Sequence, residues 1–240
     1  MIERAIEILS ASRRVVTFSG AGLSAESGVP TFRDASSRGL WSRYDPMKLA
    51  SPEGFAADPE TVIAWYNWRR TVLAGVEPNA AHRALAARTD MLHVTQNVDD
   101  LLERAGAPAD NVVHLHGSMT IDRCHRTCGF VERVELASPP PRRLCPTCTA
   151  PMRPGVVWFG ESLPPEAWTR AAEASGSCDA MIVIGTSAAV YPAAGLIGVA
   201  RQAGASVIVI NAERTDASRL ADVEIIGMAG EIVPRLVSPR

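Results

Sequence analysis

A short apolar strand that ends in small or polar residues recurs along this chain and limits the folds open to it. The recurring runs are VVTFSGAG (15–22), MLHVTQNVD (91–99), AMIVIGTS (180–187), SVIVINAE (206–213) and VEIIGMAG (223–230). Helical patterns separate several of them, as at residues 79–88 and 192–204, and residues 2–13 predict a short amphipathic helix. Strand and helix in alternation favour an α/β fold, a parallel sheet with helices on both faces. Ligands of such sheets bind beyond the carboxyl ends of the strands, where the glycines and polar residues of these runs fall.

Two stretches interrupt this alternation. Residues 31–75 are rich in tryptophan, proline and polar residues, and residues 119–155 hold paired cysteines and the proline run SPPPRR. We read both as insertions that together form a smaller module, a helical insert plus a metal-binding knuckle. The remaining residues, 1–30, 76–118 and 156–240, are then expected to form a Rossmann-like domain.

Charge and the N-terminus narrow the range of partners. The net charge of -2 gives no general reason to expect nucleic acid or an anionic membrane as a partner. The first twenty residues carry acidic side chains early and lack the basic start, apolar run and cleavage site of a signal peptide. No stretch reaches the roughly 18 apolar residues that a membrane helix needs. A cytoplasmic protein is therefore expected; its oligomeric state is not readable, and a monomer is compatible with the sequence.

Four of the five cysteines form two close pairs, Cys124-x3-Cys128 and Cys145-x2-Cys148. In a cytosolic chain such pairs suggest a metal before a disulfide, and four thiolates suit tetrahedral zinc. Four protein ligands leave no open coordination position, so the expected zinc ion is structural rather than catalytic. With the x3 spacing, His125 could in principle replace Cys124 as a ligand.

The first strand runs into Gly20-Ala21-Gly22, and glycines at such a place let the backbone approach a phosphate closely. This short pattern is weak evidence, because a tight strand-to-helix turn also explains it and the dinucleotide fingerprint GxGxxG fails at Ala25. The whole string SGAGLSAESGVPTFRD (19–34) is much more specific. It resembles the signature of sirtuins, the NAD-consuming protein-lysine deacylases. Besides the cysteine pairs, motifs that resemble the same family in the same order are TQNVD (95–99), HLHGS (114–118), VVWFGE (156–161), GTSAAVYPA (185–193) and NAE (211–213).

The resemblance covers nearly the whole chain and implies that NAD binds along the strand ends as a co-substrate. The residues implied at the glycine loop and at the loop that closes over NAD are Gly20, Ala21, Gly22, Ser24, Thr31, Phe32 and Arg33. Those implied around nicotinamide and its ribose are Gln96, Asn97 and Asp99, with Asp99 on the carboxamide. Those implied along the adenosine half are Gly185, Thr186, Ser187, Asn211, Ala212, Glu213 and Ala229.

Two histidines lie two residues apart in HLHGS, so in an extended segment their side chains point to opposite faces. Histidine is the usual general base near neutral pH, although a lone histidine is more often a packed or surface residue. The resemblance implies that His116 deprotonates a ribose hydroxyl of NAD, that Asn97 helps to orient the ribose and a water, and that His114 packs. In the implied reaction the acyl oxygen of a modified lysine attacks C1′ of the nicotinamide ribose and nicotinamide leaves. Free lysine and O-acyl-ADP-ribose result.

The VVWFGE segment is β-prone, and taken alone it suggests a core strand. In the family this segment pairs with an extended substrate peptide by strand addition. The resemblance implies that the Val157 carbonyl accepts from the substrate's Nε–H, and that Phe159, Gly160 and Glu161 border the peptide. Acylated lysine-containing proteins or peptides are therefore the expected partners.

The segment AWYNWRR (64–70) predicts a helix with two pairs at i, i+3 spacing, Trp65 with Trp68 and Tyr66 with Arg69. The indole face is expected in the core. The resemblance is closest to the sirtuin class whose acyl pocket carries a tyrosine and an arginine at this spacing. An arginine deep in an apolar channel needs an anionic partner, and the carboxylate of a succinyl or malonyl group would provide one. We therefore predict desuccinylation or demalonylation, with weaker deacetylation. The simpler interpretation is that Arg69, like Arg70, is a solvated helix arginine.

Other functions stay open at this point. A dehydrogenase would also use NAD, but the fingerprint is broken and no hydride-transfer residue set is recognisable. A zinc-containing binding protein without activity would make His116 incidental. Two further alternatives would use the same site. The protein could be predominantly a deacetylase, or it could be a mono-ADP-ribosyltransferase.

Overall fold

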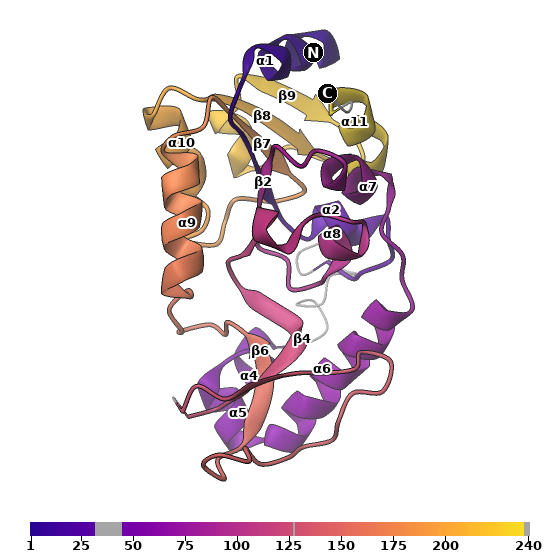
Figure 1. Ribbon diagram of the computed structural model, residues 1–240, viewed down its shortest axis with the longest axis vertical. Helices are drawn as coiled ribbons and strands as arrows, with labels where there is room; N and C mark the ends of the chain where they lie inside the picture. The colour runs from indigo at the N-terminus through magenta and orange to yellow at the C-terminus, as the bar shows by residue number, and fades with distance from the viewer. Residues whose placement is uncertain (32–44, 127, 238–240) are drawn as a thin grey trace.

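The computed structural model describes residues 1–31, 45–126 and 128–237, which form a larger and a smaller body along the longest axis (Figure 1). The larger body is built on a six-stranded parallel sheet with the order β3-β2-β1-β7-β8-β9. Its strands are β1 (Val15–Ser19), β2 (Leu92–Thr95), β3 (Val112–His114), β7 (Ala180–Ile184), β8 (Ser206–Asn211) and β9 (Val223–Ile226). The predicted parallel α/β fold is confirmed, and every strand except β3 lies inside one of the recurring apolar runs.

Helices cover both faces of this sheet. Alternate side chains of a strand point to opposite faces, so Val16 and Phe18 of β1 enter one buried cluster and Val15 enters the other. The first cluster is closed by α9 (Pro165–Ser175) and α10 (Gly195–Gln202), and the second by α1 (Ile2–Ala11), α7 (Ala80–Ala86) and α11 (Ala229–Leu236). Shorter turns are α2 (Gly22–Ala25), α8 (Leu101–Arg104), η1 (Ala109–Asn111) and η2 (Asp216–Leu220). Burial on both faces explains why the strands read as unbroken apolar runs.

In the residues that the structure describes, the smaller body, at the bottom of Figure 1, joins a three-stranded antiparallel sheet to three helices. The strands are β4 (Gly117–Cys124), β5 (Val131–Arg133) and β6 (Met152–Val156), in the order β5-β4-β6. The helices are α4 (Pro46–Leu49), α5 (Pro52–Ala57) and α6 (Pro59–Ala74). Val62 and Leu73 of α6 share a buried cluster with Met119 of β4 and Val156 of β6, so segments from the two interruptions pack together. The exact domain boundaries stay a prediction.

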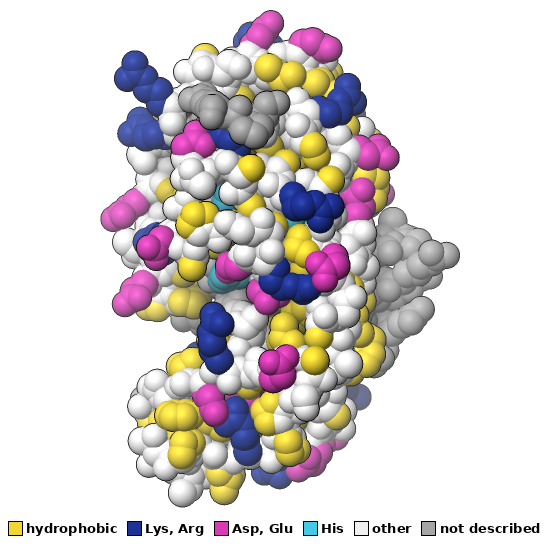
Figure 2. Space-filling view, turned by 45° about the vertical axis from the view of Figure 1, so that its right-hand side comes forward, with side chains coloured by type: hydrophobic (Ala, Val, Ile, Leu, Met, Phe, Trp, Pro, Cys, Tyr) yellow, Lys and Arg dark blue, Asp and Glu magenta, His cyan; other side chains and the backbone are white. Residues whose placement is uncertain are grey.

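The charged side chains visible on the surface agree with the small net charge of -2. On the face shown in Figure 2, acidic and basic side chains are interspersed among apolar ones, and neither sign dominates. Within the described ranges, the search for a helix long and apolar enough to cross a bilayer finds none.

Helix α6 contains the AWYNWRR segment. The helix begins where the Asp58 side chain accepts from the Thr61 N–H and where Pro59 takes the first helical position. Trp65 is buried, but Trp68 is 43% exposed, so the core prediction was wrong for the second indole. Positions i and i+3 differ by about 60° around a helix axis. This angle is enough to leave one of the two side chains at the edge of the buried helix face.

Both arginines of this segment are buried, so their interpretation as solvated helix arginines was wrong. Arg69 is 9% exposed and Arg70 is 1% exposed. Arg70 Nε donates to the Met119 carbonyl oxygen at 2.9 Å. Its Nη2 donates to the Ile121 carbonyl oxygen at 2.9 Å and to the Asp122 carboxylate at 2.8 Å. The guanidinium of Arg70 thereby fastens α6 to β4 and fixes the rotation of the helix about its own axis.

Candidate active site

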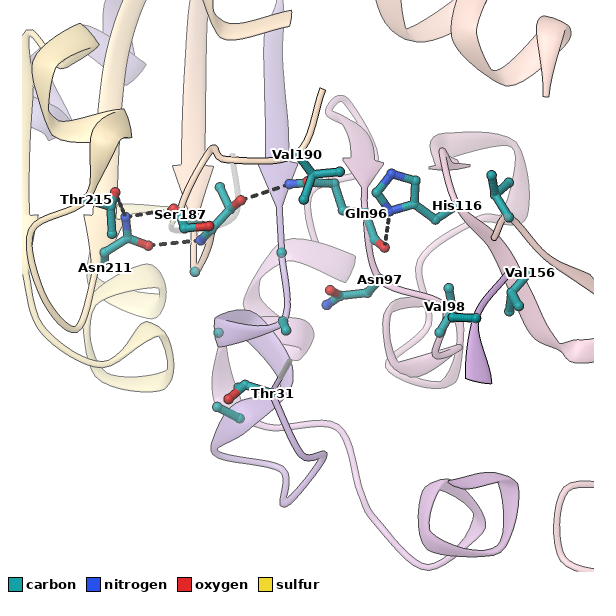
Figure 3. Close-up of a pocket in the computed structure, with 18 of the residues that line it drawn as sticks. Thr31, Gln96, Asn97, Val98, His116, Val156, Ser187, Val190, Asn211 and Thr215 are labelled. Atoms are coloured by element: carbon teal, nitrogen blue, oxygen red, sulfur yellow. Dashed lines mark hydrogen bonds between the residues drawn. The ribbon is translucent and has the colours of Figure 1, made fainter. Parts of the chain in front are cut away.

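A cavity of about 640 Å³ opens at the carboxyl ends of β1, β2, β7 and β8 and extends to the smaller body. Its wall contains residues directly after those strands, such as Gly20, Gln96 and Gly185, together with residues of α6 and of the loop after β6. Figure 3 shows lining residues from both bodies around a common space. The cavity therefore lies where a parallel sheet binds ligands.

Most of the predicted site residues line this cavity. They are Gly20, Ala21, Gly22, Thr31, Tyr66, Arg69, Gln96, Asn97, His116, Val157, Phe159, Gly160, Glu161, Gly185, Thr186, Ser187, Asn211, Ala212, Glu213 and Ala229. Ser24 and Asp99 are buried behind the wall rather than in it. Phe32 and Arg33 lie outside the described residues.

Sequence reasoning missed a set of lining residues that are mostly apolar: Ala25, Ala50, Val98, Val156, Trp158, Leu163, Val190, Tyr191, Pro192, Ile210, Thr215, Gly227 and Met228. Several of them lie inside the quoted motifs, for example Val98 in TQNVD and Trp158 in VVWFGE, so the motifs held a usable signal. Ala50 and Leu163 carry no such signal, because only the tertiary structure brings them to the cavity.

The glycine loop is shaped by a close backbone contact. The Gly22 N–H donates to the Gly185 carbonyl oxygen at 2.8 Å. A Cβ at Gly22 would lie 2.6 Å from the Gly185 Cα, and a Cβ at Gly20 would lie 2.7 Å from the Thr186 Cβ. Real Cβ atoms do not approach so closely, so both glycines are required by the packing of this loop on the segment after β7.

His116 faces the cavity with one defined tautomer. Its Nδ1 lies 3.0 Å from the Gln96 carbonyl oxygen (Figure 3). A carbonyl oxygen only accepts, so Nδ1 carries the proton and Nε2 has a free lone pair. Burial lowers the pKa of His116, and the bond to Gln96 opposes this shift only in part. The side chain is therefore neutral near pH 7 and able to take a proton at Nε2.

His114 is held away from the cavity. Its Nε2 contacts the Glu103 carboxylate at 2.7 Å and its Nδ1 contacts the Asn97 carbonyl oxygen at 3.1 Å. Burial would lower the pKa of His114, but the hydrogen bond and charge of Glu103 outweigh it and raise this pKa. The two histidines of the motif thus point to different surroundings, as an extended segment predicts.

Asn97 is positioned by a buried network that the sequence did not reveal. Its Nδ2 donates to Ser24 Oγ at 3.1 Å, and Ser24 Oγ donates to the Asp99 carboxylate at 2.9 Å. His82 Nε2 lies 3.3 Å from the same hydroxyl. The Asn79 N–H donates to His82 Nδ1 at the start of α7, so Nε2 of His82 is its donor nitrogen. Ser24 therefore uses its one proton and both lone pairs, which fixes the side-chain amide of Asn97.

Side-chain bonds also join the two halves of the cavity. Gln96 Nε2 donates to Thr186 Oγ1 at 2.9 Å (Figure 3). Asn211 Oδ1 accepts from the Thr186 N–H at 3.0 Å, and Asn211 Nδ2 donates to Thr215 Oγ1 at 3.1 Å. The segments after β2, β7 and β8 are thereby held at a fixed separation along the strand ends.

Tyr66 and Arg69 form the end of the cavity that is nearest to α6. The Arg69 Cζ atom lies 4.8 Å from the Trp65 ring centroid and 5.3 Å from that of Tyr66. Burial raises the pKa of Tyr66 to about 12, so its phenol is protonated at neutral pH. This end of the cavity combines a guanidinium and a phenol with aromatic walls.

The segment after β6 differs from the predicted strand, because β6 ends at Val156 and the chain then leaves the sheet. The Val157 N–H donates to the His116 carbonyl oxygen at 2.9 Å. Glu161 accepts from the Trp158 N–H at 2.9 Å and pairs with Arg123 and Arg153. Its carboxylate therefore stabilises the loop itself.

The four paired cysteines meet beside β4 and β6, with their Sγ atoms all within 4.8 Å of one another. The Cys124–Cys148 and Cys128–Cys145 Sγ distances are 3.4 Å and 3.6 Å. Thiolates around a tetrahedral zinc, at Zn–S distances of about 2.3 Å, stand about 3.8 Å apart, so the donor set fits one zinc ion. The ring of His125 instead packs at 5.1 Å from Phe55, and His125 does not belong to this cluster. Four protein donors make the site structural.

Comparison with known proteins agrees with this geometry. The model of the Sir2 family matches residues 20–192. NAD-dependent protein deacylase 1 of Pseudomonas aeruginosa is 47% identical over 246 residues, covering 97% of this chain and 96% of that protein. A crystal structure of a Sir2 homolog–NAD complex superposes with a TM-score of 0.90 at 45% identity, covering 98% of this chain and 92% of the other. A Sir2–p53 peptide–NAD+ structure has a TM-score of 0.84 at 30% identity, covering 98% and 97%. Matches of this extent, on a chain with this cavity and this cysteine cluster, establish that the protein belongs to the Sir2 family.

Proposed function

We propose that this protein removes acyl groups from lysine side chains with consumption of NAD, and that it favours succinyl and malonyl over acetyl. The observation that carries the acyl preference is the position of Tyr66 and Arg69 in the wall of the same cavity as His116. The names of the relatives support the general reaction. The Pseudomonas aeruginosa protein is a deacylase, and one structural neighbour holds a p53 peptide together with NAD+.

In this proposal NAD lies along the carboxyl ends of the strands. The backbone of the loop from Gly20 to Gly22, which carries only the small side chain of Ala21, would hold the pyrophosphate of NAD. Its adenosine half extends toward Asn211 and Ala229, and its nicotinamide ribose lies near Asn97 and His116. Bound there, NAD provides a ribose carbon from which nicotinamide can leave and a ribose hydroxyl that can receive the acyl group.

His116 is the general base of the proposed reaction. Its free Nε2 takes the proton of the ribose hydroxyl while the Gln96 carbonyl oxygen holds Nδ1 and orients the ring. Asn97, fixed through Ser24, helps to orient the ribose. Nicotinamide would leave C1′ of the ribose, the acyl group would pass from the lysine nitrogen to a ribose hydroxyl, and one water would be consumed, so that free lysine and O-acyl-ADP-ribose are released.

The substrate peptide would lie beside the segment after β6. In this proposal the Val157 carbonyl accepts from the lysine Nε–H, and Phe159 and Gly160 border the peptide. Glu161 contributes indirectly, because its carboxylate already binds the loop's own Trp158 N–H. Backbone pairing of this kind carries little side-chain information, so a broad range of peptide sequences is expected.

The acyl preference follows from the chemistry of the cavity end. A guanidinium binds a carboxylate through two parallel N–H donors, and a phenol can add a third hydrogen bond. A succinyl or malonyl group ends in such a carboxylate, whereas an acetyl group ends in a methyl that offers no acceptor. Arg69 lines the cavity and is largely buried, so an acyl carboxylate that reaches it would form charge-assisted hydrogen bonds out of bulk water, and an acetyl group could not.

The test compares kcat/KM on succinyl-lysine and acetyl-lysine forms of one peptide for the wild type and Arg69→Met. Losing charge-assisted hydrogen bonds should lower the succinyl value by about 10- to 100-fold, because each such bond contributes about 1.5–3 kcal/mol. The acetyl value should stay nearly unchanged. Arg4→Met, on an exposed arginine of α1, is the matched control and should alter neither value. An equal loss on both peptides would refute the carboxylate clamp.

A further inference from the structure

The tyrosine at the acyl end of the cavity has a hydrogen-bond partner outside α6. Trp158 Nε1 lies 3.0 Å from Tyr66 Oη. Both side chains are 2% exposed, and both line the cavity. Tyr66 comes from α6 and Trp158 from the loop after β6, so the bond joins the two elements between which an acyl group would have to enter.

The chemistry of the two groups fixes the direction of this bond. An indole N–H can only donate, whereas a phenol has one proton and two lone pairs. Tyr66 Oη must therefore accept from Trp158, and this bond does not use the phenolic proton. Burial raises the pKa of Tyr66 to about 12, so that proton is retained at neutral pH.

The indole is itself held firmly in place. The Arg153 Cζ atom lies 3.9 Å from the Trp158 ring centroid, and the Phe55 ring centroid lies at 5.2 Å. The backbone N–H of Trp158 donates to Glu161 at 2.9 Å, and Arg153, which is 2% exposed, pairs with the same carboxylate. Turning the indole away from Tyr66 would disrupt the buried cation–π contact with Arg153 and the ring contact with Phe55.

We propose that Trp158 is a positioning residue for acyl selectivity: by donating to Tyr66 it reserves the phenolic proton for a ligand acceptor. Together with the donor-only guanidinium of Arg69, the phenolic O–H then offers hydrogen-bond donors at this end of the cavity, which suits a carboxylate and gives no advantage to a methyl group. The inference rests on the proposed function and deepens it, because it assigns part of the preference to a residue that need not touch the acyl carboxylate.

The experiment measures kcat and KM on succinyl- and acetyl-lysine forms of one peptide for the wild type, Trp158→Phe, Tyr66→Phe and the double variant. Trp158→Phe removes the N–H donor and keeps an aromatic ring. It should lower the succinyl kcat/KM by about 3- to 10-fold, mainly through KM, as expected for one neutral hydrogen bond. The acetyl value should change much less. The double variant should be no worse than Tyr66→Phe, because Trp158 then has no hydroxyl to orient.

Two controls separate this role from general damage. Trp168→Phe, on α9 and outside the cavity, should leave both values unchanged. Replacement of Trp158 by benzothienylalanine keeps the bicyclic shape and lacks the N–H, so it should reproduce the selectivity loss even if Trp158→Phe folds poorly. Bound zinc and the melting temperature Tm report on folding in each case.

The outcomes distinguish the inference from the proposed function. If the wild type prefers succinyl and Tyr66→Phe loses that preference while both Trp158 replacements keep it, the inference is overturned and the proposed function stands. Losses at Trp158 and Tyr66 that simply multiply in the double variant would also overturn it. A wild type that does not prefer succinyl would overturn the proposed function and this inference with it.

Discussion

At the level of single residues, the contacts around His116 and Tyr66 show how a fixed hydrogen bond decides what a neighbouring atom can do. The Gln96 carbonyl holds the proton of His116 on Nδ1, and Trp158 Nε1 donates to Tyr66 Oη, which makes the phenol oxygen an acceptor in that bond. The motifs predicted His116 and Tyr66, because residue type and spacing are visible in the sequence. They did not predict Trp158 as a partner, because that contact joins segments 92 residues apart along the chain.

The pKa of His116 gives a pH prediction. Burial lowers this pKa below the ordinary value of 6.5, so the neutral form, which is the base, persists to more acidic pH than in an exposed histidine. A plot of kcat/KM for NAD against pH should show an acidic limb, from the uptake of one proton, whose apparent pKa lies below 6.5. An acidic limb with an apparent pKa above 6.5 would contradict the assignment; His114, whose pKa is raised, would then be the better candidate.

At the level of elements, helix α6 illustrates what periodicity can and cannot foresee. The pairing of Tyr66 with Arg69 follows from their i, i+3 spacing. Periodicity placed Trp68 in the core and Arg70 in solvent, and these predictions were wrong, because β4 and β6 pack on α6 and select which side is buried. The decisive contact, Arg70 with Asp122, is a tertiary ion pair that no local pattern specifies.

Breaking this contact should loosen α6. Arg70→Met would leave the Met119 and Ile121 carbonyl oxygens without this donor and would remove one of the two arginines that pair with Asp122. The free energy of unfolding, measured by urea titration, should fall by about 3 kcal/mol.

Arg142→Met is the matched control, since Arg142 and Glu60 form a largely exposed pair, and it should change the free energy of unfolding by less than about 1 kcal/mol. Similar changes in the two variants would mean that Arg70 does not anchor the helix.

For the whole molecule, the alternation of strands and helices was sufficient to predict the parallel α/β body, and the ordered motifs were sufficient to predict the family. Membership of the Sir2 family decides against the dehydrogenase alternative. The sequence could not specify how the smaller body meets the strand ends, because apolar contacts such as those of Ala50 and Leu163 depend on the packed structure. The cavity between the two bodies brings the proposed NAD site and the Tyr66–Arg69 pair into one space, and this proximity is the basis of the proposed reaction.

A competition assay tests this account most directly. The enzyme, NAD and equal amounts of succinyl-lysine and acetyl-lysine forms of one peptide are mixed, and the ADP-ribose products are followed by mass spectrometry. The account predicts that O-succinyl-ADP-ribose forms first and in excess, with one nicotinamide and one free lysine for each molecule formed. Predominant O-acetyl-ADP-ribose, or ADP-ribose attached to protein in place of either product, would contradict it.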